Sequence, residues 1–170
     1  QAWRNPRYGP IGLELLASGK SAMEAVDLMT SADPHRDSRQ LAIIGIEGNA
    51  SVFTGSECLE WAGGKQGVNY AVQGNILTGS EVVEAMGRAF EDTNGTLSER
   101  MIASLHAGQE VGGDKRGRQS AALLVVREGW GYGGLTDRFR DLRVDDHPTP
   151  IKELERIYHL HRKIFQRPDQ

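Results

Sequence analysis

Leu41-Ala42-Ile43-Ile44-Gly45-Ile46 is apolar at successive positions, a pattern that is typical of a β-strand buried on both faces. The run Ser120-Ala121-Ala122-Leu123-Leu124-Val125-Val126 repeats the pattern later in the chain. Glu47-Gly48-Asn49 predicts a hairpin turn that leads from the first run into a strand over 50–54. Because a strand that is buried on both faces needs cover on both sides, these runs predict a layered domain with helices on both sides of the β-sheet.

Helices are predicted between and around these strands from apolar periodicity and capping residues. Ser21 with Glu24 three residues later has the spacing of a capping box that begins a helix. Further helices are predicted over 80–92 and 97–109 and from Thr149-Pro150 onward, and further strands over 68–72 and 138–144, with Gly63-Gly64 in a loop. The resulting order of elements predicts an α+β class and a single domain over residues 1–170.

Composition excludes several classes of protein. The chain has 170 residues and a net charge of −3, with a pI of about 6.0, which argues against a general nucleic-acid surface. No apolar run approaches the roughly 20 residues of a membrane helix. No signal peptide is visible, and we therefore expect a cytoplasmic protein without a membrane partner. One cysteine, Cys58, excludes an internal disulfide framework and is expected to be a buried thiol.

A glycine-rich basic loop over 112–118 precedes the second apolar strand. Glycines let a backbone approach a ligand closely, and Arg116 and Arg118 supply donors for a carboxylate or phosphate. Ser120 stands where the loop enters the strand, with Gln119 before it and Asp114 earlier in the loop. The loop matches neither a P-loop nor a dinucleotide fingerprint. Its alternative interpretation is a solvated loop that feeds a core strand.

Gln73-Gly74-Asn75 ends a predicted strand with two amides around a glycine. Amide donors together with backbone N–H groups can form an oxyanion pocket, although a plain turn fits the sequence equally well.

Asp145-Asp146-His147 follows the strand over 138–144 and offers two carboxylates and an imidazole, which could bind a metal. Neighbouring residues on a strand point to opposite faces, and the charge of Arg143 on the face of Asp145 would repel a divalent ion. We therefore expect an ion pair rather than a metal, with a structural or substrate-orienting role for Asp145. A turn that begins the last helix is the simpler alternative.

Six segments, in order along the chain, carry a resemblance: Asn5-Pro6-Arg7-Tyr8-Gly9-Pro10; Asp33-Pro34 with Arg36-Asp37 and Arg39-Gln40; Thr54-Gly55 with Cys58 and Trp61-Ala62-Gly63; Tyr70-Ala71-Val72-Gln73-Gly74-Asn75; Gly117-Arg118-Gln119-Ser120-Ala121-Ala122-Leu123; and Asp141-Leu142-Arg143-Val144-Asp145-Asp146-His147-Pro148. Together they resemble the bacterial domain-of-unknown-function family 1028, which is placed among the Ntn-hydrolase-like proteins. The resemblance implies a four-layer αββα sandwich of two stacked sheets.

The same resemblance implies an enzyme class. This sequence departs from the family at its N-terminal end. Members of the superfamily use an N-terminal Thr, Ser or Cys whose own amine serves as base, and they typically cleave amide bonds. The family has a further N-terminal stretch with two strands that this sequence does not contain. Gln1 lacks a nucleophilic side chain. We therefore expect the nucleophile on an N-terminal segment of the same gene product, either absent from this chain or on a separate chain after processing.

These observations predict a hydrolase of amide bonds in a small polar or anionic molecule, without metal or cofactor and assembled as a homo-oligomer. Its expected catalytic residues are Gln73, Asn75, Asp114 and Ser120, of which Asp114 would orient the amine of the nucleophile. Its expected substrate-binding residues are Arg116, Arg118, Gln119 and Asp145. Two alternatives remain open: a non-catalytic ligand-binding module, and a structural subunit of an oligomer.

Overall fold

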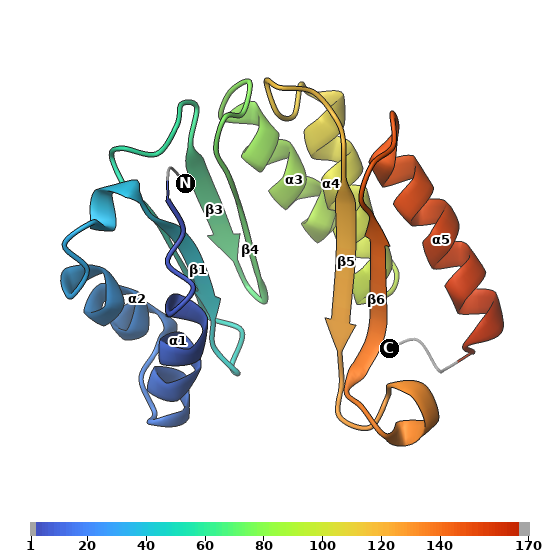
Figure 1. The fold of residues 1–170 in the computed structure, drawn as a ribbon, viewed down its shortest axis with the longest axis horizontal. Helices are drawn as coiled ribbons and strands as arrows, with labels where there is room; N and C mark the ends of the chain where they lie inside the picture. Colours follow the sequence, from blue (N-terminus) through green and yellow to red (C-terminus); the bar gives the residue numbers. More distant parts are fainter. Residues whose placement is uncertain (1–2, 167–170) are drawn as a thin grey trace. The chain divides into compact units, whose positions relative to one another are not determined.

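The computed structural model describes residues 3–166, in which helices pack on short antiparallel hairpins (Figure 1). By its internal contacts the chain divides into two compact units, residues 1–88 with 108–115 and residues 89–107 with 116–170. The boundary runs through α3 (Glu81–Asp92) and α4 (Leu97–Glu110). The division into units does not test the single domain that is expected over residues 1–170, which stays a prediction.

The first unit begins with two helices followed by two hairpins. Its elements are α1 (Tyr8–Ala17), α2 (Ala22–Ser31), the 3₁₀ turn η1 (Arg36–Ser38), β1 (Gln40–Ile44), β2 (Ala50–Thr54), β3 (Gly63–Gly67) and β4 (Tyr70–Gly74). β1 pairs with β2 and β3 with β4, both antiparallel. The two hairpins pack together, β2 against β3 and β1 against β4. At their tips the N–H of Asn69 donates to the carbonyl of Gly48 at 2.8 Å.

Helices cover the first unit on both sides of the hairpins. Val26 and Met29 of α2 pack on Leu41 of β1 and form a small buried core. α3 meets the other hairpin, where Lys65 Nζ of β3 lies 2.8 Å from Glu84 Oε2. The predicted capping box at α2 is confirmed, since the Ser21 hydroxyl accepts from the N–H of Glu24 and the Glu24 carboxylate accepts from the N–H of Ser21.

The loop predicted at Gly63-Gly64 and the strand predicted over 68–72 are partly wrong. Gly63 and Gly64 belong to β3, and residues 68 and 69 form the turn that joins β3 to β4. Glycine-rich β3 has low strand propensity, so its conformation is set by pairing with β4. At Gly63 a Cβ atom would collide with the ring of Trp61, which explains why glycine is needed at this close approach.

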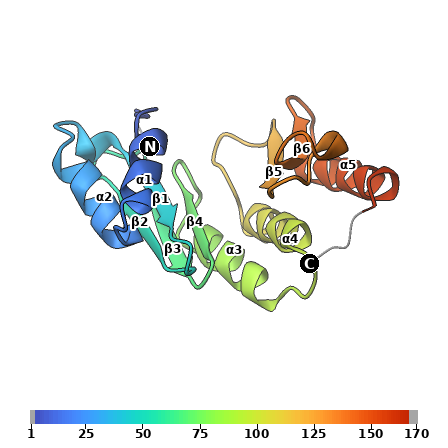
Figure 2. The ribbon, with the colours of Figure 1, turned by 90° about the horizontal axis from the view of Figure 1, so that it is seen from below.

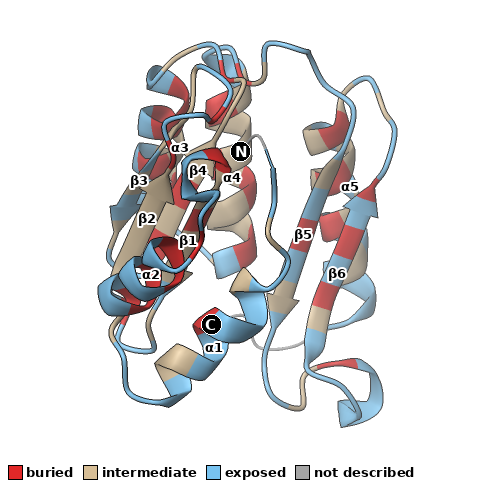
Figure 3. Ribbon diagram, turned by 60° about the vertical axis from the view of Figure 1, so that its left-hand side comes forward, coloured by how far each residue is buried: buried red, intermediate tan, exposed pale blue. Residues whose placement is uncertain are grey.

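The second unit contains one hairpin and the helices that cover one of its faces (Figure 2). Its remaining elements are β5 (Ala121–Val126), the 3₁₀ turn η2 (Tyr132–Gly134), β6 (Arg138–Val144) and α5 (Pro150–Ile164). The core joins Ile102 of α4, Leu123 and Leu142 of the hairpin, and Leu154 and Tyr158 of α5. Buried and exposed positions alternate along β6 (Figure 3), as its sequence predicts.

The two-sided burial predicted for the apolar strands is wrong for the described residues. Leu124 and Val126 of β5 are 50% and 60% exposed, because the helices of the second unit contact only the opposite face. Ile44 of β1 is likewise exposed.

The α+β class is confirmed, with small antiparallel sheets and helices. No helix within residues 3–166 is both long and apolar enough to cross a membrane.

Candidate ligand cavity at the free edge of strand β1

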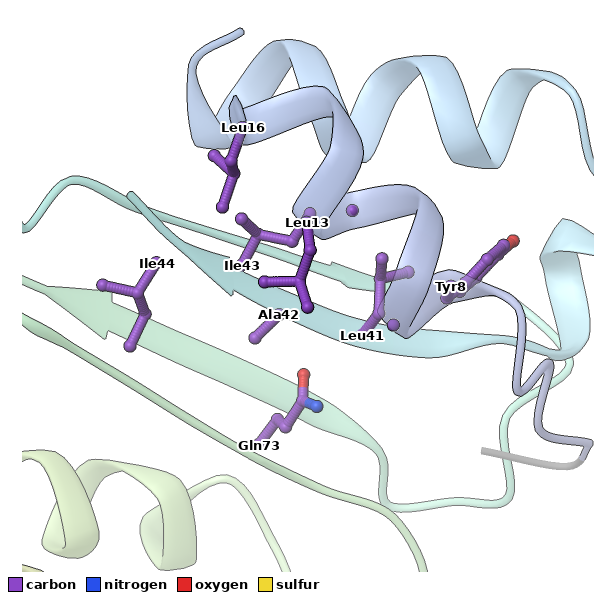
Figure 4. A pocket seen from close by; sticks show the side chains of 10 residues that line it. Tyr8, Leu13, Leu16, Leu41, Ala42, Ile43, Ile44 and Gln73 are labelled. Carbon is purple, nitrogen blue, oxygen red and sulfur yellow. The ribbon is translucent and has the colours of Figure 1, made fainter. Parts of the chain in front are cut away.

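A cavity of about 520 Å³ lies in the first unit, along β1 and beneath α1 (Figure 4). Its wall is largely aliphatic and carries no charged side chain: Tyr8, Gly9, Gly12, Leu13, Leu16, Leu41, Ala42, Ile43, Ile44 and Gln73. Gly12 allows α1 to approach β1, because a Cβ there would already lie 3.2 Å from the side chain of Ile43. The amide of Gln73 supplies the polar end of the cavity.

The edge of β1 that faces this cavity is unpaired among the described residues, since β1 bonds only β2. Two hydrogen bonds of 2.8 Å close the ladder ends, from Gly55 N–H to Arg39 O and from Gly45 N–H to Asn49 O. With this register, Leu41 and Ile43 exchange hydrogen bonds with β2. The backbone N–H and C=O groups of Ala42 and Ile44 therefore point away from β2, toward the free edge.

Gln73 brings a buried acceptor to the same place. Its side chain leaves β4 on the face opposite Tyr70 and Val72 and is directed toward Ala42 of β1 (Figure 4). The side-chain oxygen Oε1 is fully buried and has no hydrogen-bond partner within the described structure. A buried unpaired acceptor costs about 1–3 kcal/mol, so this oxygen is suited to accept from an N–H or O–H group of a ligand.

Gln40 is a functional candidate that the sequence analysis did not single out. Its Nε2 donates to the carbonyl of Gly74 at 2.8 Å and to Oγ1 of Thr54 at 3.1 Å, which ties β1 and β2 to the end of β4. Its Oε1 lies 3.5 Å from Nδ2 of Asn75, so the two amides form one cluster with Asn75 as donor. The sequence signal that could have indicated Gln40 is its place as the polar first residue of an otherwise apolar strand.

Ile76, next to this cluster, holds an unusual backbone conformation. Its φ of 60° is an outlier for a β-branched residue. Two hydrogen bonds fix it, from its N–H to the carbonyl of Leu59 at 2.9 Å and from the N–H of Lys115 to its own carbonyl at 2.8 Å. The chain then pairs Leu77 with Asp114 in a β-bridge. Asp114 thus lies in the first unit with Gln73 and Asn75.

Tyr8, at one end of the cavity, is held as a neutral donor. Its hydroxyl donates to Asp33 Oδ2 at 2.9 Å, and Nε of Arg39 donates to the same oxygen at 2.8 Å. Burial and the Asp33 carboxylate raise the pKa of Tyr8 to about 12. The hydrogen bond from Arg39 holds the pKa of Asp33 well below its usual range. This network positions α1 and leaves Tyr8 unsuited to act as a base at neutral pH.

The other predicted site residues belong to the second unit: Arg116, Arg118, Gln119, Ser120 and Asp145. All five are exposed. The predicted ion pair is confirmed, with Arg143 Nη2 at 2.7 Å from Asp145 Oδ1. The carbonyl of Gln119 accepts from the N–H of His147 at 2.9 Å, which brings this loop beside the end of β6. The roles assigned to these residues stay predictions.

The cavity offers binding rather than nucleophilic chemistry. None of its lining residues is Ser, Thr, Cys, His, Asp or Glu. Cys58 is buried, as predicted, and its thiol donates to the carbonyl of Arg39 at 3.2 Å. Within residues 3–166, no three His, Cys, Asp or Glu side chains gather as a metal site would require. The arrangement suits an uncharged, mainly apolar group that carries one hydrogen-bond donor.

The hairpins and helices define a mixed α+β protein with an apolar cavity at a strand edge that is unpaired within residues 3–166. The chain belongs to the DUF1028 family, a family of unknown function whose model matches residues 1–154. The fold is similar to the crystal structure of protein SPO2555 from Silicibacter pomeroyi, which the same family model describes. That similarity has a TM-score of 0.83 and 33% sequence identity, over 95% of this chain and 69% of the other. The resemblance found in the sequence is thereby confirmed. Among curated proteins, none matches the chain.

Proposed function

We propose that this chain is the ligand-binding part of an amide hydrolase of the Ntn type, with a four-layer αββα sandwich as its complete fold. One observation carries the proposal: Gln73, whose side-chain Oε1 is buried and has no hydrogen-bond partner within the described residues, lies in the wall of an otherwise apolar cavity. An amide substrate has an N–H that such an acceptor can bind. Asn75 and Asp114, in the same unit, are proposed to contact the reacting amide and the amine of the nucleophile.

The nucleophile is proposed to come from a segment of the same gene product that precedes Gln1 and adds as a strand to the free edge of β1. The outward backbone groups of Ala42 and Ile44 support this role. So does the anchoring of Trp3, whose N–H donates to the carbonyl of Ser38 at 3.1 Å, just before β1 begins. A strand that precedes Gln1 would therefore end near the first residue of β1.

The chemistry proposed is acyl transfer through an N-terminal Thr, Ser or Cys. Its Oγ or Sγ attacks the carbonyl carbon of the substrate while its own α-amine takes the proton. The C–N bond then breaks, and the leaving amine departs with that proton. Water finally hydrolyses the ester or thioester and frees the nucleophile.

A direct test uses the full gene product and a panel of small primary and secondary amides, with amine release as the readout. Gln73→Ala should lower kcat/KM at least tenfold, because the buried acceptor is lost. Gln166→Ala is the matched control, since Gln166 is an exposed glutamine at the other end of the chain. Absence of turnover on every amide, or equal activity of Gln73→Ala and Gln166→Ala, would contradict the hydrolase.

Strand addition has a separate test in amide hydrogen exchange. The amides of Ala42 and Ile44 should exchange rapidly in the chain of residues 1–170 and become at least tenfold slower in the full gene product. Leu41 and Ile43 are internal controls, because their amides already bond β2 in the shorter chain. Equal exchange at Ala42 and Ile44 in both proteins would rule out a strand at this edge.

A non-catalytic binding module is the second candidate, favoured by the uncharged cavity that lacks any nucleophile or base. A secondary amide such as N-butylacetamide should bind, whereas its N-methylated analogue, which has no N–H, should bind at least fivefold more weakly. Calorimetric titration measures both affinities. Binding with this preference but without turnover in the full gene product would support the module over the enzyme.

Self-association is proposed on a different surface. The face of β5 opposite Leu123 presents Ala122, Leu124 and Val126 as an exposed apolar row. Such a row, on a strand that pairs only with β6 within the described residues, is suited to contact either the second sheet of the proposed sandwich or another copy, and each use excludes the other. Light scattering of wild type and Leu124→Lys tests this. A monomeric wild type would contradict the proposal.

A further inference from the structure

Arg140 is a buried cation in the second unit. It lies on β6 with 1% of its surface exposed, on the same face as Leu142 and Val144. Its guanidinium carbon is 4.3 Å from the ring centre of Phe139 and 4.9 Å from that of Tyr158. Aromatic faces stabilise a cation at such distances, so the charge is accommodated beneath α5.

His161 of α5 meets this cation with a ring nitrogen. Nη1 of Arg140 lies 2.9 Å from Nδ1 of His161. Because a guanidinium has donors only, Nδ1 must be the acceptor, and the imidazole must be neutral with its proton on Nε2. Protonation of His161 would remove the acceptor and place two cations in contact.

His161 also contacts the residues at the end of α5. The N–H of Phe165 donates to the carbonyl of His161 at 2.8 Å, and the two rings lie 4.7 Å apart. Ile164 and Phe165 are themselves 63% and 44% exposed. The next residue, Arg162, pairs through Nη1 with Glu99 Oε1 of α4 at 2.6 Å, which gives the helix a second attachment.

We propose that Arg140 and His161 form an acid-sensitive latch that holds the last turn of α5 on β6. Around His161 stand Arg140 from β6, the Arg162–Glu99 pair that leads to α4, and Tyr158 and His159 of α5 itself. Burial and the charge of Arg140 lower the pKa of His161. The latch is therefore closed above the ordinary histidine pKa, near 6.5, and opens as pH falls through the lower folded value.

Opening is confined to the helix end. The hydrogen bond from the N–H of Thr96 lowers the pKa of Glu99, so the Glu99–Arg162 pair persists at mildly acidic pH. The latch therefore releases the residues after Arg162 while the body of α5 stays on the hairpin. This is a local conformational switch rather than acid unfolding.

Hydrogen exchange and NMR titration test the latch. In wild type, exchange of the Phe165 amide, corrected for intrinsic rate, should rise at least tenfold between pH 7 and pH 5. His161→Gln keeps an acceptor that does not titrate, and should abolish this rise. His159→Gln is the matched control on the same helix and should retain it.

Two results would overturn the proposal. One is a His161 imidazole that titrates near 6.5, as an unperturbed histidine does. The other is a Phe165 exchange rate that rises equally with acid in wild type and His161→Gln. As a positive control, His161→Lys should show fast exchange of Phe165 at both pH values.

Discussion

Replacing Leu154 by Ala should destabilise the second unit by about 3–4 kcal/mol. Leu154 is 0% exposed and lies among Leu123, Leu142 and Tyr158. The substitution removes three carbon positions, worth about 0.8 kcal/mol each in transfer free energy, or about 2.4 kcal/mol. The remainder is the cost of the cavity, because helix and hairpin close in only partly around the missing side chain.

Leu160→Ala is the matched control, on the same helix and with the same change of side chain. Leu160 is 49% exposed, so the transfer loss is roughly halved to about 1 kcal/mol and solvent fills the space. The unit can be followed by fluorescence of Trp130, which packs on Phe139 with ring centres 5.1 Å apart. The two other tryptophans, Trp3 and Trp61, are replaced by Phe in all variants for this purpose.

Urea denaturation then gives the free energy of unfolding for each variant. Leu154→Ala should lose at least 2 kcal/mol more than Leu160→Ala, with unchanged dependence on urea concentration, taking the spread of about 2–5 kcal/mol for such core truncations as a guide. Equal losses from the two substitutions would refute the packing of α5 on the β5–β6 hairpin described above.

Three further outcomes follow from the first unit. Gly55→Ala should destabilise it by about 1–3 kcal/mol, because the new Cβ would collide with the carbonyl oxygens of Arg36 and Asp37, whereas Gly9→Ala in the open first turn of α1 should be neutral or stabilising by thermal denaturation. Gln73→Met should raise the free energy of unfolding of residues 1–170 in urea by about 1 kcal/mol, because it removes an unpaired buried acceptor; a loss of stability would mean that this oxygen is already satisfied. Asp33→Asn should lower the melting temperature at pH 7 and by a smaller amount at pH 3: the depressed pKa of Asp33 adds stability above its ordinary pKa, near 4, and that stability is lost gradually as pH falls from there toward the folded value. An equal effect at both pH values would contradict the role of the Asp33 charge.

Strand positions were predicted well where one residue pattern fixes both the element and its turn. The hairpin from β1 to β2 follows from an apolar run, a turn with glycine and a second run, which together leave little choice of register. The strand β3 was missed, because glycines with a lysine and a glutamine carry no strand signal without the neighbouring β4. Arg140 was missed as a buried residue, since alternation alone does not say which face a helix will cover.

In the candidate site, too, the sequence pattern identified a residue, and the tertiary structure supplied its surroundings. Gln73 was predicted from two amides at a strand end, but its role in an oxyanion pocket was one of two equal alternatives. The observation that now favours a ligand is the apolar wall supplied by α1 and β1, about 30 or more residues earlier in the chain. The anionic substrate expected from Arg116 and Arg118 has no counterpart in that wall, because the cavity contains no charged residue.

The sequence by itself determined the α+β class, the capping box at Ser21, the hairpin turn at Glu47-Gly48-Asn49 and the family, because each depends on residues a few positions apart or on segments in a fixed order. Only the tertiary structure decided that one edge of β1 is unpaired within residues 3–166, that Gln40 joins the ends of three strands, and that Arg140 meets His161. These contacts form between residues distant in sequence. Their partners are selected by which faces the helices cover, and no local pattern records that choice.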